Sequence, residues 1–187
     1  MLADLLAHDG VLETIELRAQ FGFMAIHGGS LERGTAEVAR RAAEISGASL
    51  YAVEQPDGLQ WHVPSHLYDP AASSKLLTFL EHVEVVVSVH GYGREGFWTR
   101  LLLGGADRRL ARAVAKKLRP HLDGFEVIDD VEAIPRELRG VHPRNPCNLP
   151  RGGGVQVELP PRVRGLGPRG EPEHVEALVQ GLAAVFA

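Results

Sequence analysis

The amino-acid sequence predicts an α/β fold, because short apolar runs alternate along the chain with amphipathic stretches of helical spacing. A second observation is the nearly continuous β-branched run at Glu84–Val89, typical of a strand that is buried on both faces. The chain has 187 residues, of which 44% are hydrophobic, enough for one compact core. No stretch has the composition of a linker. We therefore expect a single domain over residues 1–187, with its core from about residue 21 onward.

Upstream of that run, the sequence predicts two strands and two helices. An apolar run predicts a strand at Phe23–Ile26, and the loop Gly28–Gly34 leads into a helix at Thr35–Ile45, with Thr35 as its N-cap. Another short apolar run predicts a strand at Ser49–Val53. A proline precedes the next amphipathic stretch, which predicts a helix at Ser73–His82.

The rest of the chain is expected to contain three more strands, two helices and one long loop. The strands are expected at Trp98–Leu103, Phe125–Ile128 and Val155–Leu159, and the helices at Ala106–Leu118 and Pro172–Phe186. Residues 135–154 are rich in Pro, Gly, Arg and Asn, which predicts a loop without regular structure. Loops of this length inside a compact domain are often functional, so we expect substrate contacts there.

Composition excludes several classes of protein. No apolar run reaches the length of about 18 residues that a membrane span requires, and the N-terminal residues lack the pattern of an export signal. Cys147 is the single cysteine, which excludes an intramolecular disulfide and suits a reducing compartment. We therefore expect a cytoplasmic protein with no membrane partner.

The formal net charge of −4 is unevenly distributed along the chain. Residues 1–93 carry 5 basic and 12 acidic side chains, whereas residues 94–169 carry 15 basic and 9 acidic ones. A locally basic segment in an acidic protein favours an anionic small substrate over nucleic acid, and no basic strand interleaved with aromatic residues is present. The alternative is that these arginines line solvated helix faces.

Two histidines follow predicted strands in the same local context: His27 precedes two glycines, and His90 precedes Gly91. Because ligands bind outside the carboxyl ends of strands in open parallel sheets, both imidazoles are expected at the edge of one site. Glu32 lies five residues after His27, and the glycine loop must fold its carboxylate back. Two imidazoles and one carboxylate around an open position are the ligand set of a catalytic zinc ion. Other divalent ions can also bind to this set of ligands. Each residue alone could instead be structural.

Glu158 is a second unusual carboxylate. In the strand Val155–Leu159, alternation places the apolar residues on one face and Gln156 with Glu158 on the other. A buried carboxylate needs a partner or a task. The task would be that of a general base acting on metal-activated water, and the alternative is an ion pair with a nearby arginine.

The 135–154 loop carries polar residues suited to binding an anionic substrate. An arginine such as Arg144 binds a carboxylate with two hydrogen bonds or stabilises an oxyanion, and Asn145 and Asn148 can fix orientation. Turn formation alone also explains such asparagines. Further candidates for substrate contacts are Gln156, His66 and Arg164. His62 and His66 could form a wall of the site or an alternative ligand pair, whereas Cys147 is expected to be structural.

The sequence resembles the poly-γ-glutamate hydrolase family, some members of which are called phage-related replication proteins. The resemblance is carried by AIHGGSLERGT at 25–35, SVHG at 88–91, the Asn145-x-x-Asn148 segment and GVQVEL at 154–159. It implies a zinc carboxypeptidase-like fold, a three-layer α/β/α sandwich around a mixed sheet. It also implies that His27, Glu32 and His90 bind Zn²⁺ and that Glu158 is the catalytic base.

These observations together predict a zinc-dependent hydrolase of amide bonds, with Arg144 holding an anionic γ-glutamyl-type substrate. A first alternative keeps the metal and deacylates small N-acyl amino acids. A second is a non-catalytic, phage-associated accessory protein of the same fold, which the presence of Glu158 disfavours. Neither nucleic acid nor a membrane is expected as a partner.

Overall fold

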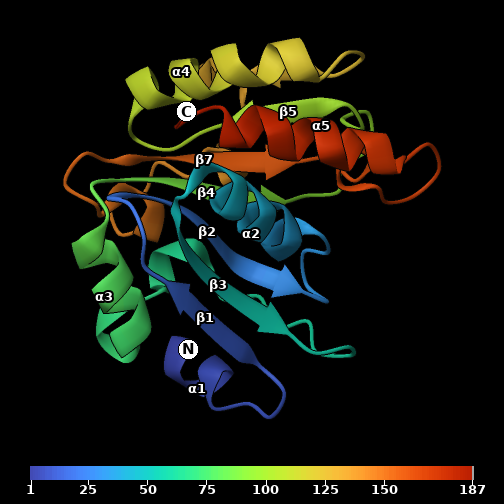
Figure 1. The fold of residues 1–187 in the computed structure, drawn as a ribbon. Helices are drawn as coiled ribbons and strands as arrows, with labels where there is room; N and C mark the ends of the chain where they lie inside the picture. The colour runs from blue at the N-terminus through green and yellow to red at the C-terminus, as the bar shows by residue number, and fades with distance from the viewer. Residues whose placement is uncertain (187) are drawn as a thin grey trace.

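The computed structural model describes residues 1–186, which form a mixed seven-stranded sheet covered by helices (Figure 1). The strands are β1 (Leu12–Glu16), β2 (Phe21–Gly29), β3 (Ser49–Gln55), β4 (Val85–Gly91), β5 (Arg100–Leu103), β6 (Glu126–Ile128) and β7 (Gly154–Leu159). The α-helices are α1 (Leu2–Leu6), α2 (Thr35–Ser46), α3 (Ser74–His82), α4 (Arg108–Leu118) and α5 (Pro172–Ala183).

The strand order β1-β3-β2-β4-β7-β5-β6 determines where the functional residues meet. Strands β3, β2, β4 and β7 run parallel to one another, whereas β1 is antiparallel to β3 and β5 is antiparallel to β7. The carboxyl ends of the neighbouring strands β2, β4 and β7 therefore lie at one edge of the sheet. This is the edge at which open α/β sheets bind ligands.

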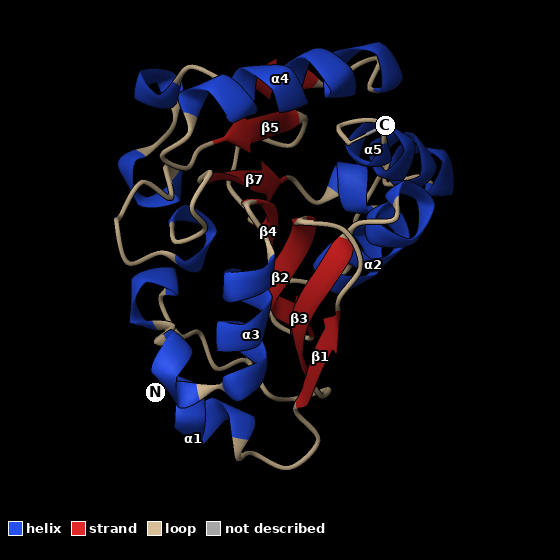
Figure 2. Cartoon of the chain, turned by 60° about the vertical axis from the view of Figure 1, so that its left-hand side comes forward, coloured by secondary structure: helices blue, strands red, loops and turns tan. Residues whose placement is uncertain are grey.

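Helices cover both faces of the sheet, with α2 and α5 on one side and α1 and α3 on the other (Figure 2). Small and branched residues such as Ala39, Val87 and Leu178 form the core beneath α2, α4 and α5. Larger side chains, among them Tyr51 and Phe79, fill the opposite core. Burial of each large apolar side chain contributes about 1.5–3 kcal/mol. The predicted α/β/α sandwich with a mixed sheet is confirmed.

Two helix starts differ from the sequence prediction for reasons of capping. Gly34, with a φ of 86°, is the N-cap of α2, and Thr35 is the first helical residue rather than the cap. Helix α4 begins at Arg108 instead of Ala106, because the Asp107 side chain accepts hydrogen bonds from the first-turn amides of Arg109 and Leu110. An aspartate in this position satisfies amides that the helix itself leaves unpaired.

The sequence prediction missed β1 and α1, and it placed no regular structure in residues 135–154. The segment 135–154 contains 3-10 turns at Arg136–Leu138 and Pro146–Asn148. In the second turn, the Asn145 side chain accepts a hydrogen bond from the Cys147 amide. The long loop is thus held by local caps, and it forms one side of the cavity described below.

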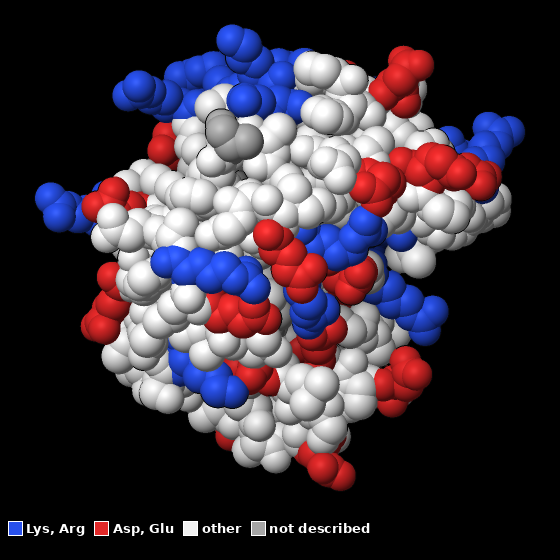
Figure 3. Space-filling model, viewed as in Figure 1, with Lys and Arg blue, Asp and Glu red and all other residues white. Residues whose placement is uncertain are grey.

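Part of the basic charge predicted to meet an anionic substrate lies elsewhere. Figure 3 shows Lys and Arg side chains gathered over α4, whose exposed residues include Arg109, Arg112, Lys116 and Lys117. The inner side of α4 packs in the core shared with α5. These charges belong to a solvated helix face. None of the described helices has the length and apolarity needed to cross a membrane.

Candidate metal centre and active site

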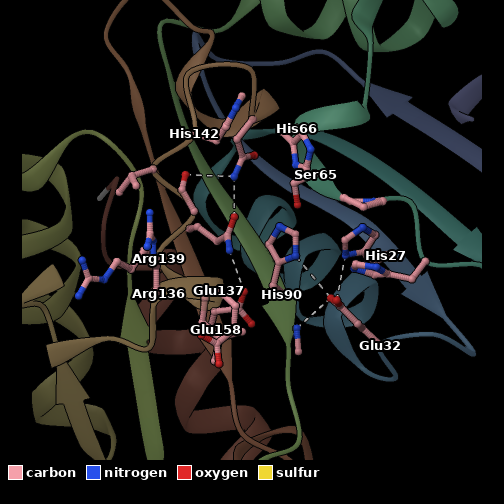
Figure 4. Close-up of a pocket in the computed structure, with 18 of the residues that line it drawn as sticks. His27, Glu32, Ser65, His66, His90, Arg136, Glu137, Arg139, His142 and Glu158 are labelled. Atoms are coloured by element: carbon pink, nitrogen blue, oxygen red, sulfur yellow. Dashed lines mark hydrogen bonds and ion pairs between the residues drawn. The ribbon is translucent and has the colours of Figure 1, made fainter. Parts of the chain in front are cut away.

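A cavity of about 840 Å³ opens at the carboxyl ends of β2, β4 and β7 (Figure 4). Its base is formed by His27, Glu32, His90 and Glu158. Two walls rise from this base. One includes residues 62–66, and the other, which we call the outer wall, is formed by residues 136–142.

The end of β2 is built to return Glu32 to His27. The pairing register of β2 with β3 shifts after Ala25, and Gly29 adopts a φ of 72°, which a side chain would disfavour. The amide of Glu32 then donates a hydrogen bond to the His27 carbonyl at 2.9 Å. The carboxylate folds back as predicted, and its Oε1 lies 2.9 Å from His27 Nδ1.

His90 approaches the same carboxylate from the neighbouring strand β4. Its Nδ1 lies 3.6 Å from Glu32 Oε2, and the Gly91 amide donates a hydrogen bond to that oxygen at 2.9 Å. Ligand atoms of His27, Glu32 and His90 all lie within 4.8 Å of one another. This spacing allows the three residues to hold one metal ion.

Hydrogen bonds on the outer side of both imidazoles fix their orientation. His27 Nε2 lies 2.9 Å from the Val63 carbonyl and donates to it, so Nδ1 faces Glu32. His90 Nε2 lies 3.0 Å from Ser88 Oγ, which likewise leaves Nδ1 toward the carboxylate. Metal-binding histidines are commonly held in this way by their second ring nitrogen.

We call the group formed by His27, Glu32 and His90 the metal corner. The electrostatics of the metal corner favour binding of a cation. Burial lowers the pKa of His27, but the charge of Glu32 and its hydrogen bond outweigh burial, so the pKa is raised. Burial raises the pKa of Glu32, but the charge and hydrogen bond of His27 outweigh it and hold the pKa well below its ordinary value. A site that retains a proton between two potential ligands attracts positive charge, and a divalent cation competes for the same lone pairs. The donor set and its electrostatics therefore fit a metal ion.

Glu158 lies beside His90, because the two residues are register partners on β7 and β4. Gln156 Nε2 donates to Glu158 Oε1 at 2.7 Å, and Asn145 Nδ2 donates to Gln156 Oε1 at 2.7 Å. Among the described residues only Gln156 donates to this carboxylate, so its second oxygen is available to the cavity. Burial raises the pKa of Glu158 to about 7. The group is therefore suited to take up and release a proton near neutral pH.

The structure separates the predicted substrate-contact residues into two groups. His66, Asn145 and Gln156 line the cavity. Arg144 is exposed and lines a neighbouring cavity of about 340 Å³, to which His66 also contributes. The expected contact of Arg144 with a substrate at the metal corner is thus not supported by its position.

Asn148 and Arg164 also lie outside the lining of the main cavity, and each binds backbone instead. Asn148 Oδ1 accepts a hydrogen bond from the Ala106 amide at 2.8 Å, and its Nδ2 donates to the Gly140 carbonyl at 2.8 Å. Arg164 is buried behind the metal corner. Asn148 therefore shapes the loop that carries the outer wall, whereas Arg164 donates to the carbonyls of Arg33 and Tyr92.

The outer wall contains residues that the sequence reasoning did not select. Arg136 is exposed, and its side chain has no hydrogen bond or ion pair among the described residues. The guanidinium of Arg139 is instead engaged by Glu132 and by the Ile134 carbonyl. The His142 ring packs against that of His66, with ring centroids 4.9 Å apart, so the two walls meet at this point. The position of these residues in the 135–154 loop was the available signal, but the sequence alone did not indicate which of its arginines would line the cavity.

This architecture defines a class: α/β proteins of the zinc-carboxypeptidase-like fold, with two imidazoles and a carboxylate at the strand ends. A metallo-carboxypeptidase from Burkholderia cenocepacia shares the fold, with a TM-score of 0.50 and 8% identity over 98% of this chain and 66% of that one. Residues 7–166 match the sequence model of the poly-gamma-glutamate hydrolase family. The chain belongs to this family of hydrolases.

Individual relatives agree with this assignment. UPF0714 protein YndL of Bacillus subtilis strain 168 is 30% identical over 138 residues, which cover 73% of this chain and 51% of YndL. A zinc-free structure of YndL has a TM-score of 0.75 and 25% identity over 94% of this chain and 88% of that one. A bacteriophage poly-gamma-glutamate hydrolase structure has a TM-score of 0.71 and 24% identity over 97% and 93% of the two chains. The region matched spans about half the length of curated YndL.

Proposed function

We propose that this chain is a zinc-dependent hydrolase of amide bonds whose substrates are γ-linked glutamyl chains. The observation that carries the proposal is the convergence of His27, Glu32 and His90 beside the buried carboxylate of Glu158 in one cavity. Membership of the poly-gamma-glutamate hydrolase family supports the substrate class. The YndL structure is described as a zinc-free apo form, and this supports zinc as the metal.

The metal would be held by Nδ1 of His27, Nδ1 of His90 and the carboxylate of Glu32. When bound, zinc would polarise the amide carbonyl and make water more acidic. The bonds to Val63 and Ser88 keep the two Nδ1 atoms directed inward, and the Gly91 amide keeps the carboxylate in place. The protein therefore presents a ligand set that needs little rearrangement to bind a cation.

Glu158 would carry the proton through the reaction. As the water oxygen bonds to the carbonyl carbon, Glu158 takes the water proton. As the carbon–nitrogen bond breaks, it gives that proton to the departing amine nitrogen. Burial raises the pKa of Glu158 in the metal-free chain, which favours uptake of the proton, and the hydrogen bond from Gln156 leaves one carboxylate oxygen available for both transfers.

The substrate carboxylate would meet Arg136 rather than Arg144. Arg136 lies on the outer wall of the cavity and has no partner among the described residues. A guanidinium binds a carboxylate with two parallel hydrogen bonds. The His66–His142 pair would contact the substrate from one side, and Asn145 would hold the Gln156–Glu158 pair in place. A cavity of about 840 Å³ has room for an extended chain.

The test is a substrate panel assayed with purified protein and added zinc. The panel would contain γ-linked glutamate oligomers, the corresponding α-linked oligomers and small N-acyl amino acids, with released amines quantified by chromatography. We expect cleavage of the γ-linked oligomers, its loss on chelation and its return with zinc. Cleavage confined to N-acyl amino acids would favour the deacylase alternative. Zinc binding without any turnover would favour the accessory protein.

A further inference from the structure

Arg164 is a buried cation without a paired carboxylate. It ends the 3-10 turn Arg162–Arg164 that follows β7, and its side chain is almost fully enclosed, with 9% of the residue exposed. None of the ion pairs formed by the described residues includes it, and its Nε has no hydrogen-bond partner among them. Arginines are seldom buried without a partner, so this one needs a physical reason.

The guanidinium of Arg164 instead joins two stretches of backbone. NH1 donates to the Arg33 carbonyl at 2.7 Å, and NH2 donates to the Tyr92 carbonyl at 3.1 Å. Arg33 directly follows Glu32 in the chain, and Tyr92 lies two residues after His90. One side chain therefore connects the two loops that present the ligand set of the metal corner.

Gly91 provides the space in which the guanidinium lies. A Cβ atom at Gly91 would stand 2.6 Å from NH1 and 2.7 Å from Cζ of Arg164, too close for real atoms. The φ of Gly91 is not among the positive values, so the backbone there would accept alanine. The glycine is thus required for the close approach of Arg164. Its own amide adds a second link between the loops by donating to Glu32 Oε2.

We infer that Arg164 is a positioning residue that holds the Glu32 and His90 loops at the separation required to bind a divalent cation. This inference rests on the metal centre of the proposed function. It replaces the expectation that Arg164 contacts substrate. Residues that orient metal ligands affect metal affinity by about 10- to 100-fold when they are removed.

Charge and geometry predict opposite effects, and this allows a decisive comparison of two variants. Lysine at position 164 keeps the positive charge but cannot span both carbonyls, whereas glutamine removes the charge as well. If Arg164 acts through its charge, Arg164→Gln should bind zinc more tightly and Arg164→Lys should be unchanged. If it acts by positioning, both variants should bind zinc about 10- to 100-fold more weakly.

Arg108 offers a matched control. It is partly buried and also joins backbone segments, because it donates to the carbonyls of Leu103, Gly104, Gly105 and Asp129, none of which belongs to the loops that carry Glu32 and His90. Arg108→Gln should lower the melting temperature but leave the zinc dissociation constant within about twofold of wild type. If Arg164 only stabilised the fold, Arg164→Gln would behave like Arg108→Gln: it would lower the melting temperature without weakening zinc binding.

The measurement is the zinc dissociation constant, by competition with a chelating dye, for wild type, Arg164→Lys, Arg164→Gln, Arg108→Gln and Gly91→Ala. Gly91→Ala displaces the guanidinium without removing it, so we expect it to weaken zinc binding too, and to add little in combination with Arg164→Gln. Unchanged zinc affinity in both Arg164 variants and in Gly91→Ala would overturn this inference but leave the proposed metal centre standing. Wild-type protein that binds no zinc would overturn both the metal centre and this inference.

Discussion

The base and the outer wall of the cavity differ in burial and in bonding. In the base, His27 and His90 are each 2% exposed and Glu158 is 5% exposed, and each has a hydrogen-bond partner. On the outer wall, Arg136 and His142 are exposed. Buried polar groups with fixed partners preserve one geometry, whereas exposed loop residues are free to adapt. The difference fits our proposal that the base performs the chemistry and that the outer wall recognises the substrate.

The largest effect should follow from removing an imidazole of the base. His90→Ala removes a ligand atom that lies with those of His27 and Glu32, so zinc content should fall from about one ion per chain to nearly none. Elemental analysis after dialysis measures this directly. His142→Ala, which removes an exposed imidazole from the outer wall, should retain its zinc. Equal zinc content in the two variants would abolish the distinction between base and wall.

The next effect concerns proton transfer. Glu158→Gln keeps the size of the side chain and its place beside Gln156 but removes the proton acceptor. We expect kcat to fall by about 10²- to 10⁴-fold, with zinc content and circular dichroism unchanged. Steady-state kinetics on a γ-linked oligomer would measure the change. A variant with wild-type kcat would rule out Glu158 as the base.

A smaller effect should sharpen the role of the outer wall. Arg136→Gln should raise KM by about tenfold, equivalent to about 1.4 kcal/mol, for substrates with free carboxylates, with little change in kcat. Substrates whose carboxylates are amidated should not distinguish the variant from wild type. Arg144→Gln is the matched control, because Arg144 lies at the neighbouring cavity. A rise in KM with Arg144→Gln alone would transfer the carboxylate contact to that arginine.

The last expected effect concerns the stability of the fold rather than binding or catalysis, and is a pH dependence of stability in metal-free protein. The pKa of Glu158 is about 7 in the folded chain and near 4.5 when unfolded, so the folded state binds its proton more tightly. Its contribution to the free energy of unfolding is complete below about pH 4.5 and is lost as the pH rises through about 7. At about 1.4 kcal/mol per pKa unit, the loss is at most about 3 kcal/mol.

Urea unfolding in the presence of a chelator, at pH 5 and pH 8, would measure this loss. Wild type should lose more stability between the two pH values than Glu158→Gln, which cannot titrate at this position. Identical pH dependence in both proteins would show that the Glu158 proton is bound equally in the folded and unfolded states.

The arrangement of the cavity base was more predictable from sequence than that of the outer wall. His27, His90 and Glu158 end buried strands, and the parallel order of those strands brings their side chains together without information about loops. Arg144 and Arg136 lie in one long loop, whose direction depends on 3-10 turns and on hydrogen bonds from Asn145 and Asn148 to the Gly140 carbonyl. No local pattern specifies which arginine such a loop turns inward.

The strands of the sheet also differ in how well the sequence predicts them. Strand β4 was evident from its continuous apolar run, although it extends to Gly91. Strand β1 was missed because its residues are mostly half-buried and include two glutamates, and its place at the edge of the sheet depends on pairing with β3. Tertiary pairing, rather than local propensity, makes such an edge segment a strand.

The insertion of β7 between β4 and β5 has an evolutionary consequence. After β4 the chain leaves the base, builds β5, α4, β6 and the outer wall, and then returns to the sheet to contribute Glu158. None of the hydrogen bonds that orient His27, Glu32 or His90 comes from the exposed residues of the segment 130–138. If the proposed division of roles holds, we expect descendants of such a chain to acquire new substrates through changes in this segment while the base of the cavity is inherited unchanged.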